Sequence, residues 1–188
     1  MICVFEFLIL NQQDIFYLIL TILSAFFVKI TDLQVDDNKK FFFKEFKFLT
    51  AISYGSIFGY LIHADPGFGA IIAGIILANI FSNKFDDLSH LLAIIPFFLI
   101  PFILGFSKIL LMVALLFFIS ALFDEKMHDL SEKRDKKHKL FIVLSKYRLF
   151  SWILALLVSF LLKDYIYIIA LVIFDIAYKL TEHIFSRN

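Results

Sequence analysis

The sequence is poor in the residues that would support a disulfide-stabilised or loop-rich protein. Its 188 residues include one cysteine, three prolines and six glycines. The single cysteine, Cys3, excludes an intramolecular disulfide bond. Charged residues make up 19% of the chain, against about 25% in a typical soluble domain. The net charge of +1 does not indicate a strongly acidic or basic partner.

Motifs with a known catalytic or binding mechanism are also missing. There is no P-loop, no nucleophilic triad pattern and no cysteine-based zinc site. The aspartate-rich patterns NDxxDxxxD and DDxxD are absent, as is the pattern DGxxAR. No nucleic-acid-binding motif is present, so no nucleic-acid partner is expected. The first ten residues, MICVFEFLIL, lack the basic n-region of a secretory signal. Any chemistry must come from side chains that the fold brings together.

Long apolar runs dominate what is there. Hydrophobic residues make up 61% of the chain. A helix of about 20 apolar residues can span the hydrocarbon core of a bilayer, which is about 30 Å thick. We therefore predict an all-α, polytopic transmembrane bundle of about seven helices, a single integral membrane domain over 1–188 in the cell membrane. The predicted helices are 15–30, 48–63, 67–83, 88–104, 107–123, 148–162 and 165–180.

The positions of Lys and Arg predict the orientation of this bundle. With the N-terminus outside and the C-terminus inside, sixteen of the eighteen Lys and Arg residues lie on the inner side, and only Lys108 and Lys163 lie outside. That distribution follows the positive-inside rule. The region 124–147 then becomes the main cytoplasmic loop, and residues 40–48 form an interfacial lead-in to the second helix. Residues 1–14 receive no assigned role.

Small residues and prolines mark the third and fourth predicted helices. Ala70, Gly74 and Ala78 recur every four residues, a spacing that lets helix backbones approach closely. This pattern indicates ordinary helix packing, and the alternatives are a face for a ligand or for a second copy of the chain. Pro96 and Pro101 interrupt the fourth helix and favour a kink. The residues LGFSK at 104–108 predict a hairpin between the fourth and fifth helices.

Acidic residues gather at the predicted inner ends of the helices. They follow the first, third and fifth helices, and one further acid lies inside the last helix. A negative charge at an exposed helix C-terminus is unfavourable by up to about 1 kcal/mol, so these acids require cations nearby. The residues concerned, with one histidine close to them, are Asp32, Asp36, Asp86, Asp87, Asp124, Glu125, His128 and Asp175.

Two interpretations account for the neutralisation of these acidic residues. In the first, lysines close in sequence (Lys29, Lys84 and Lys126) neutralise each group, and Asp86 or Asp87 caps the fourth helix. In the second, the eight residues named above contribute ligands to a shared divalent cation such as Mg²⁺, which prefers carboxylate oxygens. The pairs Asp87–His90 and Glu125–His128 favour the second, because a spacing of three places a carboxylate and an imidazole on one helix face.

Three functions are compatible with these features. The first is a divalent-metal-dependent intramembrane enzyme acting on a phosphate-bearing lipid at the cytoplasmic face, with Lys or Arg from 126–148 on the phosphate. The second is a transporter or channel lined by Asp175, Asn79 and the kinked fourth helix. The third is a non-catalytic scaffold or complex subunit that docks a partner through 124–147. The expected partners are the bilayer and lipid phosphates or anionic headgroups.

Overall fold

The computed structural model describes residues 10–37, 39, 41–84, 87–133 and 148–186. Those residues form seven α-helices and no β-strand, as the sequence predicts. The helices are α1 (Gln12–Val35), α2 (Phe46–Ala64), α3 (Pro66–Phe81), α4 (Leu88–Leu104), α5 (Leu111–Lys133), α7 (Leu149–Leu162) and α8 (Ile166–Ser186).

Helix α1 begins with a capping box. Asn11 accepts a hydrogen bond from the backbone N–H of Asp14 at 2.9 Å, and the Asp14 carboxylate accepts one from the backbone N–H of Asn11 at 3.0 Å. These bonds satisfy two backbone groups that the first turn would otherwise leave unpaired. The helix therefore starts at Gln12 and runs to Val35, beyond the predicted 15–30 at both ends.

Helix α5 differs most from the prediction. It begins at Leu111, because residues 105–110 form the connection that follows α4, and Gly105 there has φ of +100°. It then continues to Lys133. The first part of the predicted cytoplasmic loop 124–147 is thus helical, and residues 134–147 lie outside the described part of the chain. Asp124 and Glu125 consequently lie within a helix and not at its end.

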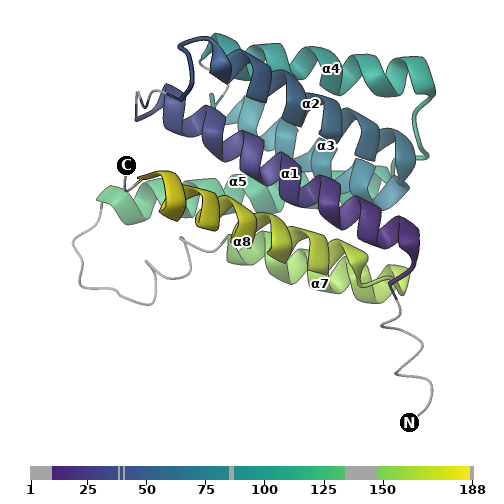
Figure 1. Ribbon diagram of the computed structural model, residues 1–188. Coiled ribbons are helices and arrows are strands. Elements are labelled where there is room, and N and C mark those ends of the chain that lie inside the picture. Colours follow the sequence, from purple (N-terminus) through teal and green to yellow (C-terminus); the bar gives the residue numbers. More distant parts are fainter. Residues whose placement is uncertain (1–9, 38, 40, 85–86, 134–147, 187–188) are drawn as a thin grey trace.

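The helices lie along one common direction (Figure 1). Six of them contact one another in a closed order, α1–α2–α3–α5–α7–α8 and back to α1, and α4 packs on α2. The α1–α2 and α3–α4 connections lie at the same end of the bundle as the end of α8 (Figure 1). We call this the mouth end. The α2–α3, α4–α5 and α7–α8 connections lie at the opposite end.

Aromatic and branched side chains fill the core at the opposite end. The Phe68 ring packs edge-on between Tyr17 and Tyr167, with both ring centroids 5.5 Å away. Phe117 and Leu61 are almost completely buried in the same cluster. Three helices, α1, α3 and α8, are therefore held together by one aromatic stack, which is worth more than its buried area alone.

Close backbone contacts at glycines determine how α2 packs on α4 and how α3 packs on α5. A Cβ atom on Gly55 would lie 2.2 Å from the carbonyl oxygen of Ala93 on α4. A Cβ atom on Gly74 would lie 2.5 Å from the carbonyl oxygen of Ala114 on α5. The small residues of α3 thus serve helix packing at Gly74, in agreement with the first interpretation of that pattern.

The membrane-spanning part of the prediction is supported only in part. Among the described helices, α1 is long and apolar enough by length and composition to cross a membrane. Shorter apolar helices are α3, α4 and α7. A buried core helix or an N-terminal signal sequence would pass the same test as α1. The described part of the chain is thus helical and has one candidate membrane span.

We expect Gly55→Ala to destabilise the protein, although alanine is intrinsically favoured over glycine in a helix by about 1 kcal/mol. The new methyl group must displace the α4 backbone, and such overpacking costs about 1–3 kcal/mol. Thermal unfolding followed by circular dichroism in detergent would measure the change. Ser53→Ala on the same helix is the control and should leave the unfolding temperature nearly unchanged. An unchanged temperature for Gly55→Ala would contradict the close α2–α4 contact.

Candidate functional site

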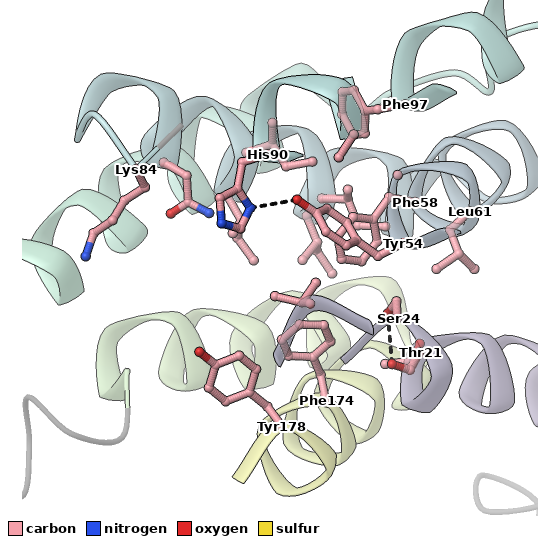
Figure 2. Close-up of a pocket in the computed structure, with 18 of the residues that line it drawn as sticks. Thr21, Ser24, Tyr54, Phe58, Leu61, Lys84, His90, Phe97, Phe174 and Tyr178 are labelled. Atoms are coloured by element: carbon pink, nitrogen blue, oxygen red, sulfur yellow. Dashed lines mark hydrogen bonds between the residues drawn. The ribbon is translucent and has the colours of Figure 1, made fainter. Parts of the chain in front are cut away.

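A cavity of about 460 Å³ lies inside the bundle. That volume is within the range of small-molecule sites in proteins, about 300–1,000 Å³. The lining residues come from α1, α2, α3, α4, α5 and α8, from the connections that follow α1 and α3, and from Arg148 at the start of α7. Figure 2 shows the cavity between Tyr54, Phe58 and Leu61 of α2 and Phe174 and Tyr178 of α8.

The polarity of the lining changes along the bundle. On α3 the lining side chains are apolar up to Ile76 and polar from Asn79 onward. On α4, which runs in the opposite direction, polar His90 comes first and apolar Phe97 comes last. The charged lining residues all lie at the mouth end, and they are Asp32, Asp36, Lys84, Glu125 and Arg148, accompanied there by Tyr54, Asn79, Asn83, His90 and Tyr178. Farther from the mouth, the polar groups of the lining are the hydroxyls of Thr21, Ser24 and Tyr167. The cavity suits an amphiphilic molecule.

Four lining side chains from four helices form a chain of polar contacts at the mouth end. Tyr54 Oη lies 2.9 Å from His90 Nδ1 (Figure 2). His90 Nε2 lies 3.6 Å from Asp32 Oδ1, and Tyr178 donates a hydrogen bond of 2.6 Å to Asp32 Oδ2. The Asp32 carboxylate is thus shared between α4 and α8, and the chain links the two sides of the cavity.

Two cationic side chains lie at the same mouth. Lys84 Nζ lies 2.6 Å from Glu125 Oε1, and both residues line the cavity. Arg148 also lines the cavity and is exposed. The prediction that acids in this region have cationic partners is confirmed for Glu125. The partner, however, is Lys84 of the α3–α4 connection and not a lysine close to Glu125 in the sequence.

Asp87 is the cap of α4 and does not line the cavity. Its carboxylate accepts hydrogen bonds from Lys47 Nζ at 2.9 Å and from the backbone N–H and hydroxyl of Ser89. The prediction that Asp86 or Asp87 caps the fourth helix is confirmed for Asp87. The predicted pairing with His90 is not formed, because His90 contacts Tyr54 and Asp32 instead. Burial alone would raise the pKa of Asp87, but these hydrogen bonds outweigh it and lower the pKa to about 2.

Asp124 and Asp175 each have a partner on α7. Asp124 accepts hydrogen bonds from the backbone N–H groups of Phe150 and Ser151, at 3.0 and 2.9 Å. Asp175 accepts a hydrogen bond of 2.6 Å from the indole N–H of Trp152. Neither carboxylate lines the cavity, so the structure uses them to join α5 and α8 to α7.

The predicted divalent-cation site is not assembled by the described residues. Within 10–37, 39, 41–84, 87–133 and 148–186, no group of three or more His, Cys, Asp or Glu side chains lies close enough to hold a metal ion. Asp32, Asp36 and Glu125 do share the cavity mouth. Asp86 lies outside the described residues, as does the side chain of His128. The full set of eight residues stays a prediction.

Several site residues are missed by sequence reasoning. Tyr54 and Tyr178 lie inside apolar helices, where a tyrosine hydroxyl requires a hydrogen-bond partner. The need for such a partner is the feature of the sequence that points to Tyr54 and Tyr178 as site residues. Asn83 offers no such signal, because an amide at a helix end is usually solvated. Arg148 is one of many basic residues in 126–148, and the sequence does not distinguish it from the others.

Comparison of the chain with protein-family models, curated proteins and solved structures finds no match. The geometry of the cavity is therefore the basis for a functional assignment.

We expect Asp87→Asn to reduce the sensitivity of the protein to acid. The pKa of Asp87 is lower in the folded state than the ordinary value of 3.8. Its charge therefore stabilises the fold above about pH 4, and that contribution, on the order of 1 kcal/mol, is lost as the pH falls toward 2. Unfolding temperatures measured between pH 5 and pH 2 should fall less steeply in the variant. Asp37→Asn, at an exposed position, is the control, and equal slopes for wild type and Asp87→Asn would contradict the assignment.

Proposed function

We propose that the protein is a multi-pass membrane enzyme that binds a phosphate-bearing lipid in this cavity, from the cytoplasmic side. The apolar outer surface of the bundle supports the membrane setting. Phe102 is 77% exposed and Leu161 is 76% exposed. A soluble monomer seldom carries apolar patches larger than a few hundred Å². Further exposed apolar residues are Phe98 and Ile103 on α4, Leu111, Met112 and Leu115 on α5, and Ile153, Leu157 and Phe160 on α7.

The distribution of charge supports a cytoplasmic mouth. Lys108 lies in the α4–α5 connection and Lys163 caps the end of α7, both at the end opposite the mouth. Lys44, Lys47 and Lys84 lie in or next to the connections at the mouth end. Basic residues concentrate on the cytoplasmic side of membrane proteins, so this orientation places the polar end of the cavity at the cytoplasmic surface.

The nature of the ligand follows from the two ends of the cavity. Phe58, Ile72 and Phe97 line the apolar part, which suits a hydrocarbon chain. Lys84 and Arg148 lie at the mouth, where lysine and arginine can hold a phosphate by charge-assisted hydrogen bonds. The change from apolar to polar lining within one cavity is the observation that carries this proposal. An ion pathway would require charged or strongly polar lining toward the opposite end as well. There the described lining residues are Leu61, Phe68 and Tyr167, and none of them is charged.

The polar chain at the mouth supports an enzyme over a simple carrier. Tyr54, His90, Asp32 and Tyr178 place ionisable groups where the lipid headgroup would lie. Ionisable side chains inside membrane bundles are costly and usually functional. Of the predicted Mg²⁺ ligands, Asp32, Asp36 and Glu125 line the cavity, and participation of a cation stays a prediction.

The membrane topology has a direct test. In a Cys3→Ala background, Lys163→Cys should react with a membrane-impermeant maleimide added to intact cells. Lys44→Cys should react only after the cells are lysed, because the mouth end faces the cytoplasm. Modification would be followed by the mass shift on a gel. Recovery of the protein in the soluble fraction, or equal labelling of both positions in intact cells, would contradict the proposal.

The ligand class can be tested by thermal stabilisation of the detergent-purified protein with n-dodecyl phosphate. At a concentration of about 100 times the Kd, we expect the unfolding temperature to rise by roughly 5–10 °C. The alcohol n-dodecanol has the same chain without the phosphate and should give a much smaller rise, because it lacks the group that the mouth cations bind.

Paired variants provide the control for this experiment. Lys84→Gln with Arg148→Gln removes the two mouth cations and should abolish the advantage of the phosphate over the alcohol. Lys108→Gln with Lys163→Gln removes the same charge at the opposite end and should retain it. If both ligands stabilise wild type equally, the cavity does not recognise phosphate.

A further inference from the structure

Two consecutive acidic residues of α5 point to different partners at the mouth end. Asp124 is buried, with an exposed fraction of 5%, and its partners belong to the first turn of α7. Glu125 lines the cavity and pairs with Lys84. Each acid is thus bound to a segment that carries one of the two mouth cations.

The contacts of Asp124 compensate for a helix start that lacks a cap of its own. Arg148 is the N-cap of α7, and its side chain makes no capping hydrogen bond. The Asp124 carboxylate supplies the cap from α5: it accepts bonds from the N–H groups of Phe150 and Ser151 and a third, of 2.6 Å, from the Ser151 hydroxyl. The first N–H groups of a helix have no intrahelical partner, so α7 begins where Asp124 holds it.

This cap also determines the backbone conformation of Arg148. Arg148 has φ of 44° and ψ of 48°, in the left-handed region. Residues other than glycine are disfavoured there and persist only where neighbouring contacts impose the conformation. The bonds to Asp124 start two residues later, at Phe150, and hold the backbone that turns Arg148 into the mouth of the cavity.

The contact of Glu125 performs the corresponding role for Lys84. Lys84 belongs to the connection between α3 and α4, where its backbone N–H donates to the carbonyl of Asn79 and its side chain is half-exposed. Its ammonium group lies 2.6 Å from Glu125 Oε1, which directs a flexible side chain toward the cavity. A cation held in place before the ligand arrives loses less conformational freedom on binding.

We propose that Asp124 and Glu125 are positioning residues, which set Arg148 and Lys84 for the phosphate of the bound lipid. This inference rests on the proposed function. A positioning role predicts a change in phosphate affinity opposite to the one that simple charge repulsion predicts. A carboxylate near the site that did nothing else would repel a phosphate, so its neutralisation would tighten binding. A positioning carboxylate has the opposite effect, and its neutralisation weakens binding.

Double-mutant cycles test the proposal, with the affinity for n-dodecyl phosphate as the readout. Asp124→Asn keeps the shape of the side chain but replaces one acceptor oxygen with a donor. We expect it to weaken binding about tenfold in the wild-type background, the size of one lost charge-assisted bond. In the Arg148→Gln background it should have no further effect, because the cation that it positions is gone. An equal loss in both backgrounds would show a purely structural role and overturn the proposal.

Glu125→Gln and Lys84→Gln form a second cycle with the same expectation. Glu125 is not part of the buried α5–α7 contact, so this cycle remains decisive if Asp124→Asn does not fold. Tighter binding of the phosphate by Glu125→Gln would overturn the proposal for this residue. In both cycles the affinity for n-dodecanol should stay unchanged.

The two proposals fail in different ways. If wild type does not prefer n-dodecyl phosphate to n-dodecanol, the proposed ligand is wrong and the positioning role falls with it. If wild type prefers the phosphate but both cycles are additive, the ligand assignment stands and only the positioning role is wrong.

Discussion

The structure depends on one constraint, which is that a polar group inside an apolar bundle must have a partner. Asp32, Asp87, Asp124 and Asp175 all meet it through a donor on another helix or connection. Each bond therefore fixes two segments relative to each other and satisfies a charge at the same time. Apolar packing alone is non-directional. The polar bonds select one arrangement among the many that the same apolar surfaces would allow.

The polarity of the cavity results from the direction of the helices. Consecutive helices alternate in direction over much of the chain, so a polar residue near the end of one helix meets a polar residue near the start of the next. Asn79 near the end of α3 and His90 near the start of α4 lie on the same cavity for this reason. A polar site can thus form at one end of the bundle when each contributing helix carries a polar side chain near that end.

The sequence predicts the large features of the fold and few details of the site. The number of helices follows from the apolar runs, and the connection at Gly105 follows from its local sequence. The length of α5 does not, because a charged stretch can be a loop or a solvated helix. The sequence identifies the acids near the mouth, but it predicts lysines close in sequence as their partners. Asp87 bonds Lys47, forty residues away, and such a partner follows only from the packing of α2 against α4.

The contacts between α1 and α8 have a consequence for folding. Tyr178 bonds Asp32, Glu182 pairs with Lys29, and Lys39 donates to the backbone of Phe185, across sequence separations of 146, 153 and 146 residues. Domains begin to fold from the N-terminus during synthesis, yet the first helix described here acquires these partners only when the last has emerged. Until then Asp32 lacks the hydrogen bond from Tyr178, and Lys29 lacks its ion pair with Glu182. A nascent chain that stops before α8 therefore lacks the part of the cavity wall that Phe174 and Tyr178 provide.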